Sequence, residues 1–486
     1  MNYRMVFGIL GKVLVAEAVL LLFPMLIGII YAENNFLDFF IPAIGLLAVG
    51  APLSFIRNKD GSMYAKEWFV TVALAWIIMS LVGALPFVLS GEIASFIDAV
   101  FETVSGFTTT GASILSGEQI DGMSRGMMFW RLFTHWIGGM GILVFVLAVV
   151  PTNSAGVMHV FRTEAPGPSV GKLVSKLSVT AKILYGIYFA MTIMECVLLL
   201  FGGLPFYDAL LLSFTTAGTG GFSISSTNAV NYSSYVQIVI AIFMFLFGIN
   251  FNTYYLILIG QVRKAFASEE VRIYLIAVIA ATIAITLNIF FAAGNLVLNF
   301  GDALKQAFFQ VASITSTTGL STADFNDWPE FSQAILMLLT IVGACGGSTG
   351  GGIKFARVII LNKTTGSNFK RLIHPRAVVT TKFEGETLDK ETERNVKTYF
   401  ILWFAIAVIC ILLLTFDGYT TLFEDLSATL ACIGNVGPGF GVVGPMGSYA
   451  EYSAFSKLIL SAVMLIGRLE IFPVLLLFAP HTWKRG

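Results

Sequence analysis

Long apolar stretches separated by short polar segments follow one another along the whole chain. A helix needs about 20 predominantly apolar residues to cross the hydrocarbon layer of a membrane. Ten stretches are predicted to cross: Val13–Tyr31, Phe36–Phe55, Trp68–Leu89, Met127–Val150, Ile183–Leu204, Val236–Gly260, Ile273–Ala293, Ala334–Val342 continued beyond a glycine-rich break, Tyr399–Phe416 and Phe455–Phe478. This pattern predicts an all-α membrane protein.

Shorter apolar segments lie between paired spans, and each leads into a glycine-containing loop. In each of them an acidic or amide side chain stands thirteen positions before a glycine. The four pairs are Asp98 and Gly111, Asp208 and Gly221, Gln306 and Gly319, and Glu424 and Gly437. The glycines recur at intervals of 98 to 118 residues. Such a long internal period indicates duplicated units, here a span, a short helix, a loop and a second span.

The repeat divides the chain into five predicted parts. Residues 1–60 form two extra N-terminal transmembrane helices, and pore repeats 1 to 4 occupy residues 61–160, 161–265, 266–390 and 391–486. The second helix of the third repeat is predicted to be broken. We expect the four repeats to surround one pseudo-fourfold pore.

The physics of a short helix explains why the repeated unit keeps its parts. A helix of about ten residues rises about 15 Å, half the hydrocarbon thickness, and must return on the side it entered. Irregular backbone survives at that depth only when it is buried in protein or lines a water-filled cavity. Glycine lets successive carbonyl groups turn the same way, and four such loops can form a carbonyl ring that replaces the hydration shell of a cation.

The alternative reading of these loops is that they are ordinary extracellular turns. Four matches at one offset, each between two spans, favour the pore loops instead. The register is open in the second repeat, where Gly218, Gly220 and Gly221 compete for the position equivalent to Gly111.

Composition and charge agree with a membrane protein and give its orientation. The chain of 486 residues is 56% hydrophobic and 12% charged, whereas a soluble domain carries about 25% charged residues. The net charge is zero, which gives no indication of a nucleic-acid partner. Basic residues cluster after every second span, which by the positive-inside rule predicts that both termini are cytoplasmic. These clusters are Arg57, Lys59 and Lys66; Arg162, Lys172, Lys176 and Lys182; Arg263, Lys264 and Arg272; Lys363, Lys370, Arg371, Arg376 and Lys382; and Lys484 and Arg485.

The glycine-rich break at Gly343–Gly352 is the first candidate for a gate. Each glycine weakens a helix by about 1 kcal/mol relative to alanine, so the span is predicted to break beside a cavity. The order of the sequence places this segment on the cytoplasmic side of the third loop. A phosphate-binding loop is excluded because Lys354 follows an isoleucine in an apolar segment. Close packing of helices through small residues remains the alternative.

Arg468 is the second candidate, because it stands near the middle of the last span. A charge at that depth costs about 2.5–3.5 kcal/mol, so Arg468 is expected to face the interior or the pore. There it would repel cations and act as a brake on conduction. Carbonyl groups of the Gly343–Gly352 segment are its expected partners, since Glu470 points elsewhere on the helix. A purely structural bridge between two helices is the alternative.

Other polar residues within the spans are assigned structural roles. Glu17 and Glu195 are expected to make helix–helix contacts, although either acid could couple transport to H⁺ or Na⁺ in a symporter. Arg131 and His135 lie near the outer end of a span, where extension of the side chain to the interface is the ordinary explanation. A membrane-embedded enzyme is a remote alternative, because paired acids or an activated nucleophile at convincing spacing are missing from the sequence.

Several motifs together resemble the Trk/Ktr/HKT superfamily of K⁺ transporters over nearly the whole chain. They are Ser105-Gly-Phe-Thr-Thr-Thr-Gly-Ala112, Trp136-Ile-Gly-Gly-Met-Gly-Ile142, Thr219-Gly-Gly-Phe-Ser223, Gly248-Ile-Asn-Phe251, Ser316-Thr-Thr-Gly-Leu320, Gly346-Gly-Ser-Thr-Gly-Gly-Gly-Ile-Lys354, Asn435-Val-Gly437 and Gly467-Arg-Leu-Glu470. The two extra N-terminal spans resemble the TrkH branch rather than the shorter KtrB branch.

The resemblance implies a bacterial inner-membrane K⁺ channel or transporter subunit that is not an enzyme. It implies K⁺ at a filter made of Thr109, Thr110, Gly111, Gly220, Gly221, Thr318, Gly319, Val436 and Gly437. It implies a gate made of Gly346, Gly347, Ser348, Thr349, Gly350, Gly351, Gly352, Lys354 and Arg468. It further implies a homodimer regulated by a cytosolic ring protein of the TrkA type. That partner would bind NAD(H) or ATP, whereas this chain would bind no cofactor.

Overall fold

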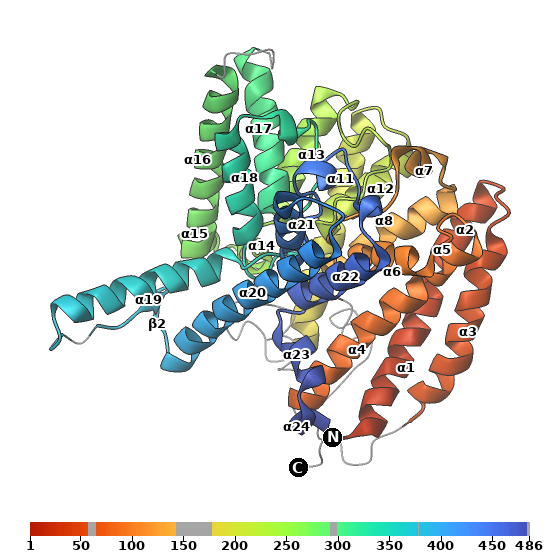
Figure 1. The fold of residues 1–486 in the computed structure, drawn as a ribbon, viewed down its shortest axis with the longest axis horizontal. Coiled ribbons are helices and arrows are strands. Elements are labelled where there is room, and N and C mark those ends of the chain that lie inside the picture. Colours follow the sequence, from red (N-terminus) through yellow and green to blue (C-terminus); the bar gives the residue numbers. More distant parts are fainter. Residues whose placement is uncertain (57–64, 142–176, 292–298, 378, 484–486) are drawn as a thin grey trace.

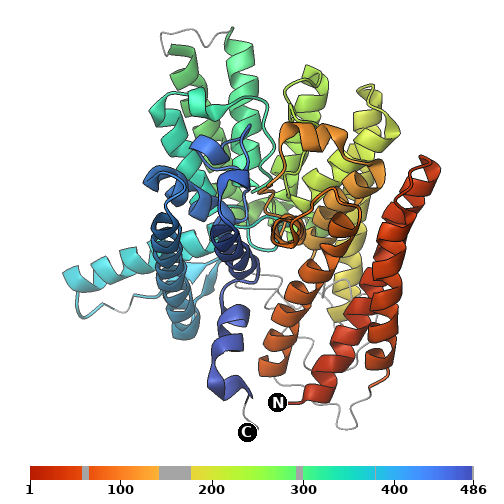
Figure 2. The same ribbon diagram turned by 45° about the vertical axis from the view of Figure 1, so that its right-hand side comes forward.

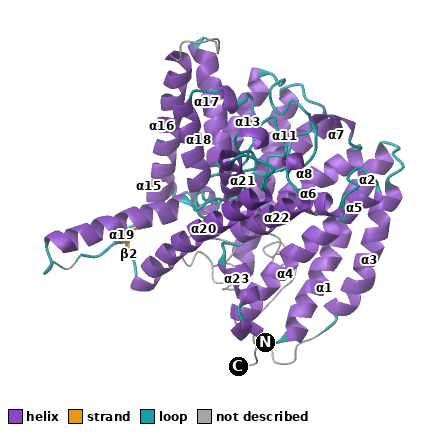
Figure 3. Ribbon diagram, viewed as in Figure 1, coloured by secondary structure: helices purple, strands orange, loops and turns teal. Residues whose placement is uncertain are grey.

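The computed structural model describes residues 1–56, 65–141, 177–291, 299–377 and 379–483. Within these ranges nearly all regular structure is helical (Figure 3). One small antiparallel hairpin joins β1 (Lys382–Phe383) to β2 (Glu386–Thr387). The predicted all-α fold is confirmed.

The two N-terminal helical segments form a pair at one side of the molecule (Figures 1 and 2). Helices α1 (Tyr3–Leu20) and α2 (Leu22–Ile30) continue one another through Leu21, and α3 (Phe36–Ser54) packs against α1. The two backbones approach closely at Gly11, where an added Cβ would lie 2.7 Å from the carbonyl carbon of Leu53. A larger residue there would push the pair apart.

A long helix, a short helix and a second helix then follow four times, and the second helix is interrupted in the second, third and fourth sets. The first set is α4 (Ala65–Gly83) with α5 (Leu85–Leu89), α6 (Phe96–Phe107) and α8 (Arg125–Gly139). The second is α11 (Leu177–Phe201), α12 (Phe206–Gly218), and α13 (Ser234–Phe247) with α14 (Phe251–Leu258). The third is α16 (Glu269–Phe291), α17 (Phe300–Thr315), and α18 (Glu330–Val342) with α19 (Phe355–Ile373). The fourth is α20 (Lys390–Asp417), α21 (Leu422–Gly434), and α22 (Ala454–Arg468) with α23 (Phe472–Phe478).

Short elements complete the described part of the chain. The remaining α-helices are α7 (Gly117–Gly122), α15 (Val262–Ala267) and α24 (Pro480–Trp483). Three short 3₁₀ turns span Phe325–Asp327, Gly441–Val443 and Tyr449–Glu451.

The four sets pack in a closed cyclic order. The second helix of each set contacts the short helix of the next: α8 packs on α12, α13 on α17, α18 on α21, and α22 returns to α6. The short helices, hereafter the pore helices, are therefore surrounded by the long ones. Small residues make the contacts close. Gly139 of α8, for example, faces the backbone of Gly218 at the end of α12.

The predicted spans are recovered in part as continuous helices. Within the described residues, six helices are long and apolar enough to cross a membrane, or seven when a bent pair is counted as one span. The predicted span Val236–Gly260 is that pair, α13 and α14, which bend by 91°. The span Met127–Val150 is described only as far as residue 141. The basic residues Arg57, Lys59, Arg162, Lys172, Lys176, Lys484 and Arg485 also lie outside the described ranges.

Two helices predicted to be continuous are broken for identifiable reasons. After Gly248, the side chain of Asn250 accepts a hydrogen bond from the Asn252 amide and starts α14 as a new helix. Between α22 and α23, Ile471 has a φ of 69°, which no right-handed helix allows. The second helix is thus interrupted in the second and fourth sets as well as in the third.

The two ends of the described chain lie together. In Figures 1 and 2, α24 lies beside the start of α1, and the Tyr3 hydroxyl donates to the Trp483 carbonyl at 3.2 Å.

Candidate functional site

Each pore helix ends in the same backbone turn. One residue takes the left-handed conformation, and its amide and the next amide bind carbonyls three and five residues back at 2.8–3.2 Å, as in a Schellman motif. The left-handed residues are Thr109, Thr219, Thr317 and Asn435, with φ of 53°, 53°, 63° and 52°. Two residues later come Gly111, Gly221, Gly319 and Gly437, with φ of 80°, 88°, 87° and 95°.

This shared geometry answers the question of register in the second repeat. Gly221 has the positive φ and follows a left-handed threonine by two residues, as Gly111 does. Gly218 is the last residue of α12, and Gly220 is the residue before the equivalent glycine. The four loops therefore align on Gly221.

The four glycines interlock in a ring. A Cβ added to Gly111 would overlap the carbonyl oxygen of Gly220, which immediately precedes the next glycine. In the same way, a Cβ added to each of the other three glycines would overlap a carbonyl oxygen of the next loop. The pairs are Gly221 with Thr318, Gly319 with Val436, and Gly437 with Thr110. The order closes on itself, and each loop is within contact distance of the next. Nearly all the predicted filter residues are buried here, and Gly111 alone among them is partly exposed.

Two of the four left-handed residues, Thr317 and Asn435, carry polar side chains that hold their loops to the surroundings. The conformation costs a residue with a Cβ about 1–2 kcal/mol, so glycine would fit more easily. The Thr317 hydroxyl accepts a hydrogen bond from the Gly351 amide at 2.6 Å, and the Asn435 amide group donates to the Thr110 hydroxyl at 2.9 Å. Thr219, Thr317 and Asn435 were not among the predicted site residues. Their signal is a hydrogen-bonding residue two positions before each glycine.

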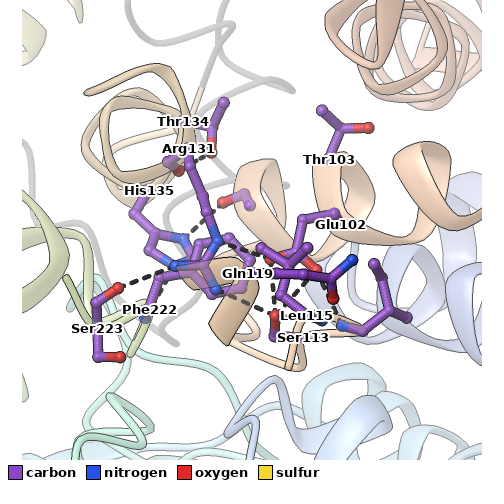
Figure 4. Close-up of polar contacts among 12 residues, drawn as sticks. Glu102, Thr103, Ser113, Leu115, Gln119, Arg131, Thr134, His135, Phe222 and Ser223 are labelled. Atoms are coloured by element: carbon purple, nitrogen blue, oxygen red, sulfur yellow. Dashed lines mark hydrogen bonds and ion pairs between the residues drawn. The ribbon is translucent and has the colours of Figure 1, made fainter. Parts of the chain in front are cut away.

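Arg131 and His135 correct the sequence prediction. Both were expected to reach the membrane interface, but both are buried, at 2% and 0% exposure. They lie on α8 against the first two loops (Figure 4). Arg131 Nε is 2.7 Å from Glu102 Oε1 on pore helix α6. Depth along a span does not reveal which face of a helix a residue occupies, and here the face points inward.

The glycine-rich segment between α18 and α19 lies against the third and fourth loops. Besides the bond from Gly351 to Thr317, the Gly352 amide donates to the Gly434 carbonyl at 2.8 Å. The segment also pairs with the α13–α14 bend, because the Phe251 amide donates to the Gly347 carbonyl at 3.0 Å. The irregular backbone of this segment is thus hydrogen-bonded to the third loop and to the ends of neighbouring helices.

Arg468 bridges this segment to the first repeat. Its Nη1 donates to the Thr349 carbonyl at 2.8 Å, as expected for a partner in the glycine-rich segment. Its Nη2 donates to the Gly138 and Gly139 carbonyls at 2.6 and 2.9 Å, a contact that was not predicted. Lys354 Nζ donates to the Gly350 carbonyl within the segment. Glu470 pairs instead with Arg357.

A buried acid outside the predicted site ties both ends of the segment together. Glu270, in the first turn of α16, accepts hydrogen bonds from the Gly346 amide at 2.7 Å and the Ala356 amide at 2.9 Å. Glu384 of the β1–β2 hairpin in turn accepts from the Glu269 and Glu270 amides, both at 3.1 Å. A chain of polar contacts therefore runs from the hairpin to the glycine-rich segment.

Glu17 and Glu195, both fully buried, make the helix contacts expected of them. Glu17 of α1 lies against Gly83 of α4, and neither of its carboxyl oxygens has a hydrogen-bond partner within the described residues. Glu195 of α11 lies beside Thr216 of α12.

Comparison with known proteins places this arrangement among transport proteins. The family described as TrkH, cation transport protein, matches residues 34–485. The Trk system potassium uptake protein TrkH of Salmonella typhimurium is 33% identical over 489 residues, which cover all of both chains. TrkG of Escherichia coli is 30% identical over 95% of this chain and 94% of its own. The crystal structure of the potassium transporter TrkH from Vibrio parahaemolyticus is 31% identical, covers all of both chains and superposes with a TM-score of 0.89.

Proposed function

Because this chain belongs to the TrkH family of cation transport proteins, we propose that it is the ion-conducting subunit of a K⁺ uptake system. The family and the apolar helices make it a multi-pass membrane protein. The observation that carries the proposal is the closed ring of four loops, with a positive-φ glycine at the same place in each. The relatives are named as potassium uptake proteins.

K⁺ is the proposed cargo, held by the backbone of the loops. Carbonyl groups of successive residues replace the water around a dehydrated cation. The filter residues are Thr109, Thr110, Gly111, Gly220, Gly221, Thr318, Gly319, Val436 and Gly437. Their support is the repeated turn, which gives each loop the same backbone course. Glycine in all four positions favours K⁺ over Na⁺, as the family resemblance implies.

The gate is assigned to the glycine-rich segment Gly346–Gly352 together with Lys354 and Arg468. Its support is the contact of Gly351 and Gly352 with the third and fourth loops. Arg468 holds the segment to α8 through three carbonyl groups, so its release would free the segment. A positive charge beside the ion path also opposes the entry of cations.

A cytosolic partner and a second copy complete the proposed assembly. The names of the relatives refer to a Trk system, which agrees with a regulatory ring of the TrkA type that binds NAD(H) or ATP. The proposed assembly is a homodimer in the bacterial inner membrane with cytoplasmic termini. The contacts from Glu384 through Glu270 to Gly346 give a cytosolic partner a route to the segment.

Uptake of radioactive Rb⁺ into proteoliposomes tests the function. We expect uptake that excess K⁺ suppresses and equal Na⁺ leaves largely unchanged. The reversal potential should follow the K⁺ gradient alone when a pH or Na⁺ gradient is imposed. Rb⁺ uptake driven by either gradient would favour a symporter in which Glu17 or Glu195 carries the coupling. Protein-free liposomes are the control, and absence of uptake by folded protein would contradict the proposal.

A further inference from the structure

Arg131 contacts both of the first two loops at matching positions (Figure 4). Its Nη2 donates to the Ser113 hydroxyl at 3.1 Å, and its Nη1 donates to the Ser223 carbonyl at 2.9 Å. Ser113 and Ser223 each stand two residues after the loop glycine. Its Nε binds Glu102, whose carboxylate also accepts from the Ser113 hydroxyl at 2.9 Å. One guanidinium therefore joins a pore helix, its own loop and the neighbouring loop.

Phe222, the residue after the second loop glycine, is held from two directions. The Arg131 guanidinium carbon lies 3.8 Å from the centre of its ring, a cation–π contact. His135 Nδ1 lies 2.8 Å from the Gly106 carbonyl, which can only accept, so Nδ1 carries the hydrogen. His135 Nε2 then accepts from the Phe222 amide at 3.2 Å. The backbone of the second loop is thereby fixed to the end of the first pore helix.

The burial of the ion pair indicates a positional role. The side chains of Arg131 and Glu102 are 1% and 0% exposed. Removing two charges from water costs about as much as their attraction returns, and apolar residues of similar volume often stabilise a protein as well or better. A planar guanidinium with five donors in a fixed fork, by contrast, sets the distances between its partners. The pair is therefore better explained by geometry than by stability.

The other repeats lack this charge at the equivalent position. Glu102 stands nine residues before Gly111, and Gln310 stands nine before Gly319. Gln310 contacts Ser321 at 3.4 Å as Glu102 contacts Ser113, but it is neutral. In the second and fourth repeats the position holds Leu212 and Ala428. The ring of loops is thus braced by charge at the junction of the first and second loops.

We propose that Arg131 and Glu102 are positioning residues that determine ion selectivity by fixing the separation of the first and second loops. The inference rests on the proposed function, since it concerns the filter of a K⁺ pathway. It adds to the filter two side chains that touch no ion. A looser junction would let the carbonyl groups close around the smaller Na⁺.

The test is the ratio of K⁺ to Na⁺ permeability in proteoliposomes for the double variant Glu102→Gln/Arg131→Gln. Removing both charges leaves neither one buried without a partner. We expect the ratio to fall by about tenfold, the factor that loss of one charge-assisted hydrogen bond corresponds to, while K⁺ flux persists. The milder Ser113→Ala removes the hydroxyl between the two charges and should lower the ratio less. If the double variant does not fold, the permeability ratio of Ser113→Ala decides the test.

Asp98→Asn is the matched control on the same pore helix. Asp98 lies one turn before Glu102, and its carboxylate pairs with Lys457 of α22 at 2.8 Å rather than with either of the first two loops. We expect its permeability ratio to equal that of the wild type. Wild-type permeability ratios in a folded double variant and in Ser113→Ala would overturn the proposed positioning role of Arg131 and Glu102. Failure of the wild type itself to pass K⁺ would instead overturn the proposed function.

Discussion

At the scale of single residues, the loop glycines were predictable from the sequence. The burial of Arg131 against the loops and the left-handed conformation of the residues before the glycines were not. The thirteen-residue offset identified Gly111, Gly319 and Gly437, because a backbone that needs positive φ and close approach selects glycine. Arg131 was misplaced, because its burial depends on how α8 rotates against two loops far away in the sequence. A hydrogen-bonding residue does stand two positions before each glycine, but the left-handed conformation of Thr219 and Asn435 becomes apparent only from the turn that ends each pore helix.

Gly111→Ser should lower the ratio of K⁺ to Na⁺ permeability. Gly111 has a φ of 80°, and a Cβ there would overlap the Gly220 carbonyl, so the first two loops must separate. A residue with a Cβ in strained backbone costs about 1–3 kcal/mol, enough to reduce the ratio by about tenfold. Bi-ionic reversal potentials measure it. Gly45→Ser on α3, where a Cβ meets nothing within 4 Å, is the control, and an unchanged ratio would remove Gly111 from the filter.

Arg468→Ala should raise the flux of K⁺. The guanidinium donates to three carbonyl groups on two separate elements, and each bond to a charged group is worth about 1.5–3 kcal/mol. Without them the glycine-rich segment leaves α8 more often, and we expect Rb⁺ uptake to increase several-fold. Arg468→Lys should lie between the two, since an ammonium group reaches fewer carbonyls at once. A folded alanine variant with slower uptake would contradict the role of a brake.

At the scale of elements, helix breaks were predictable only where glycine is dense. Ten residues from Gly343 to Gly352 include six glycines, and no helix survives that composition. The breaks at Asn250 and Ile471 each depend on one local geometry, an amide cap in the first case and a positive φ in the second. Single residues of those types occur inside many intact helices, so these two breaks could not be predicted from the residue types alone.

Deleting Gly346, Gly347 and Ser348 should open the pathway constitutively. The shortened segment cannot reach both the Glu270 carboxylate and the third loop, which it now contacts through Gly351. We expect Rb⁺ uptake that no longer responds to the cytosolic partner. Gly366→Ala on α19, where a Cβ meets nothing within 4 Å, is the control for changes near this helix. Loss of all uptake in well-folded protein would argue against a gate.

At the scale of the whole molecule, the repeat predicted four units around one axis but not how they join. The contact of α8 with the next pore helix, for example, depends on the small residues Gly139 and Gly218. The place of the N-terminal pair beside the first repeat was equally open, because α1 meets α4 through close contacts that hydropathy does not encode. The composition predicts that lipid surrounds the protein. The closed order of the four helix sets depends instead on which helix surfaces pack against one another.

The closed ring also has a genetic consequence. All four quarters are translated from one message, so a mutation such as Gly111→Ser alters one quarter and spares three. A pore assembled from identical subunits would carry the same mutation four times. Each of the four loops can therefore change in evolution independently of the other three. The Arg131–Glu102 ion pair, which lies between the first and second loops, is a difference between repeats of the kind that such independent change produces.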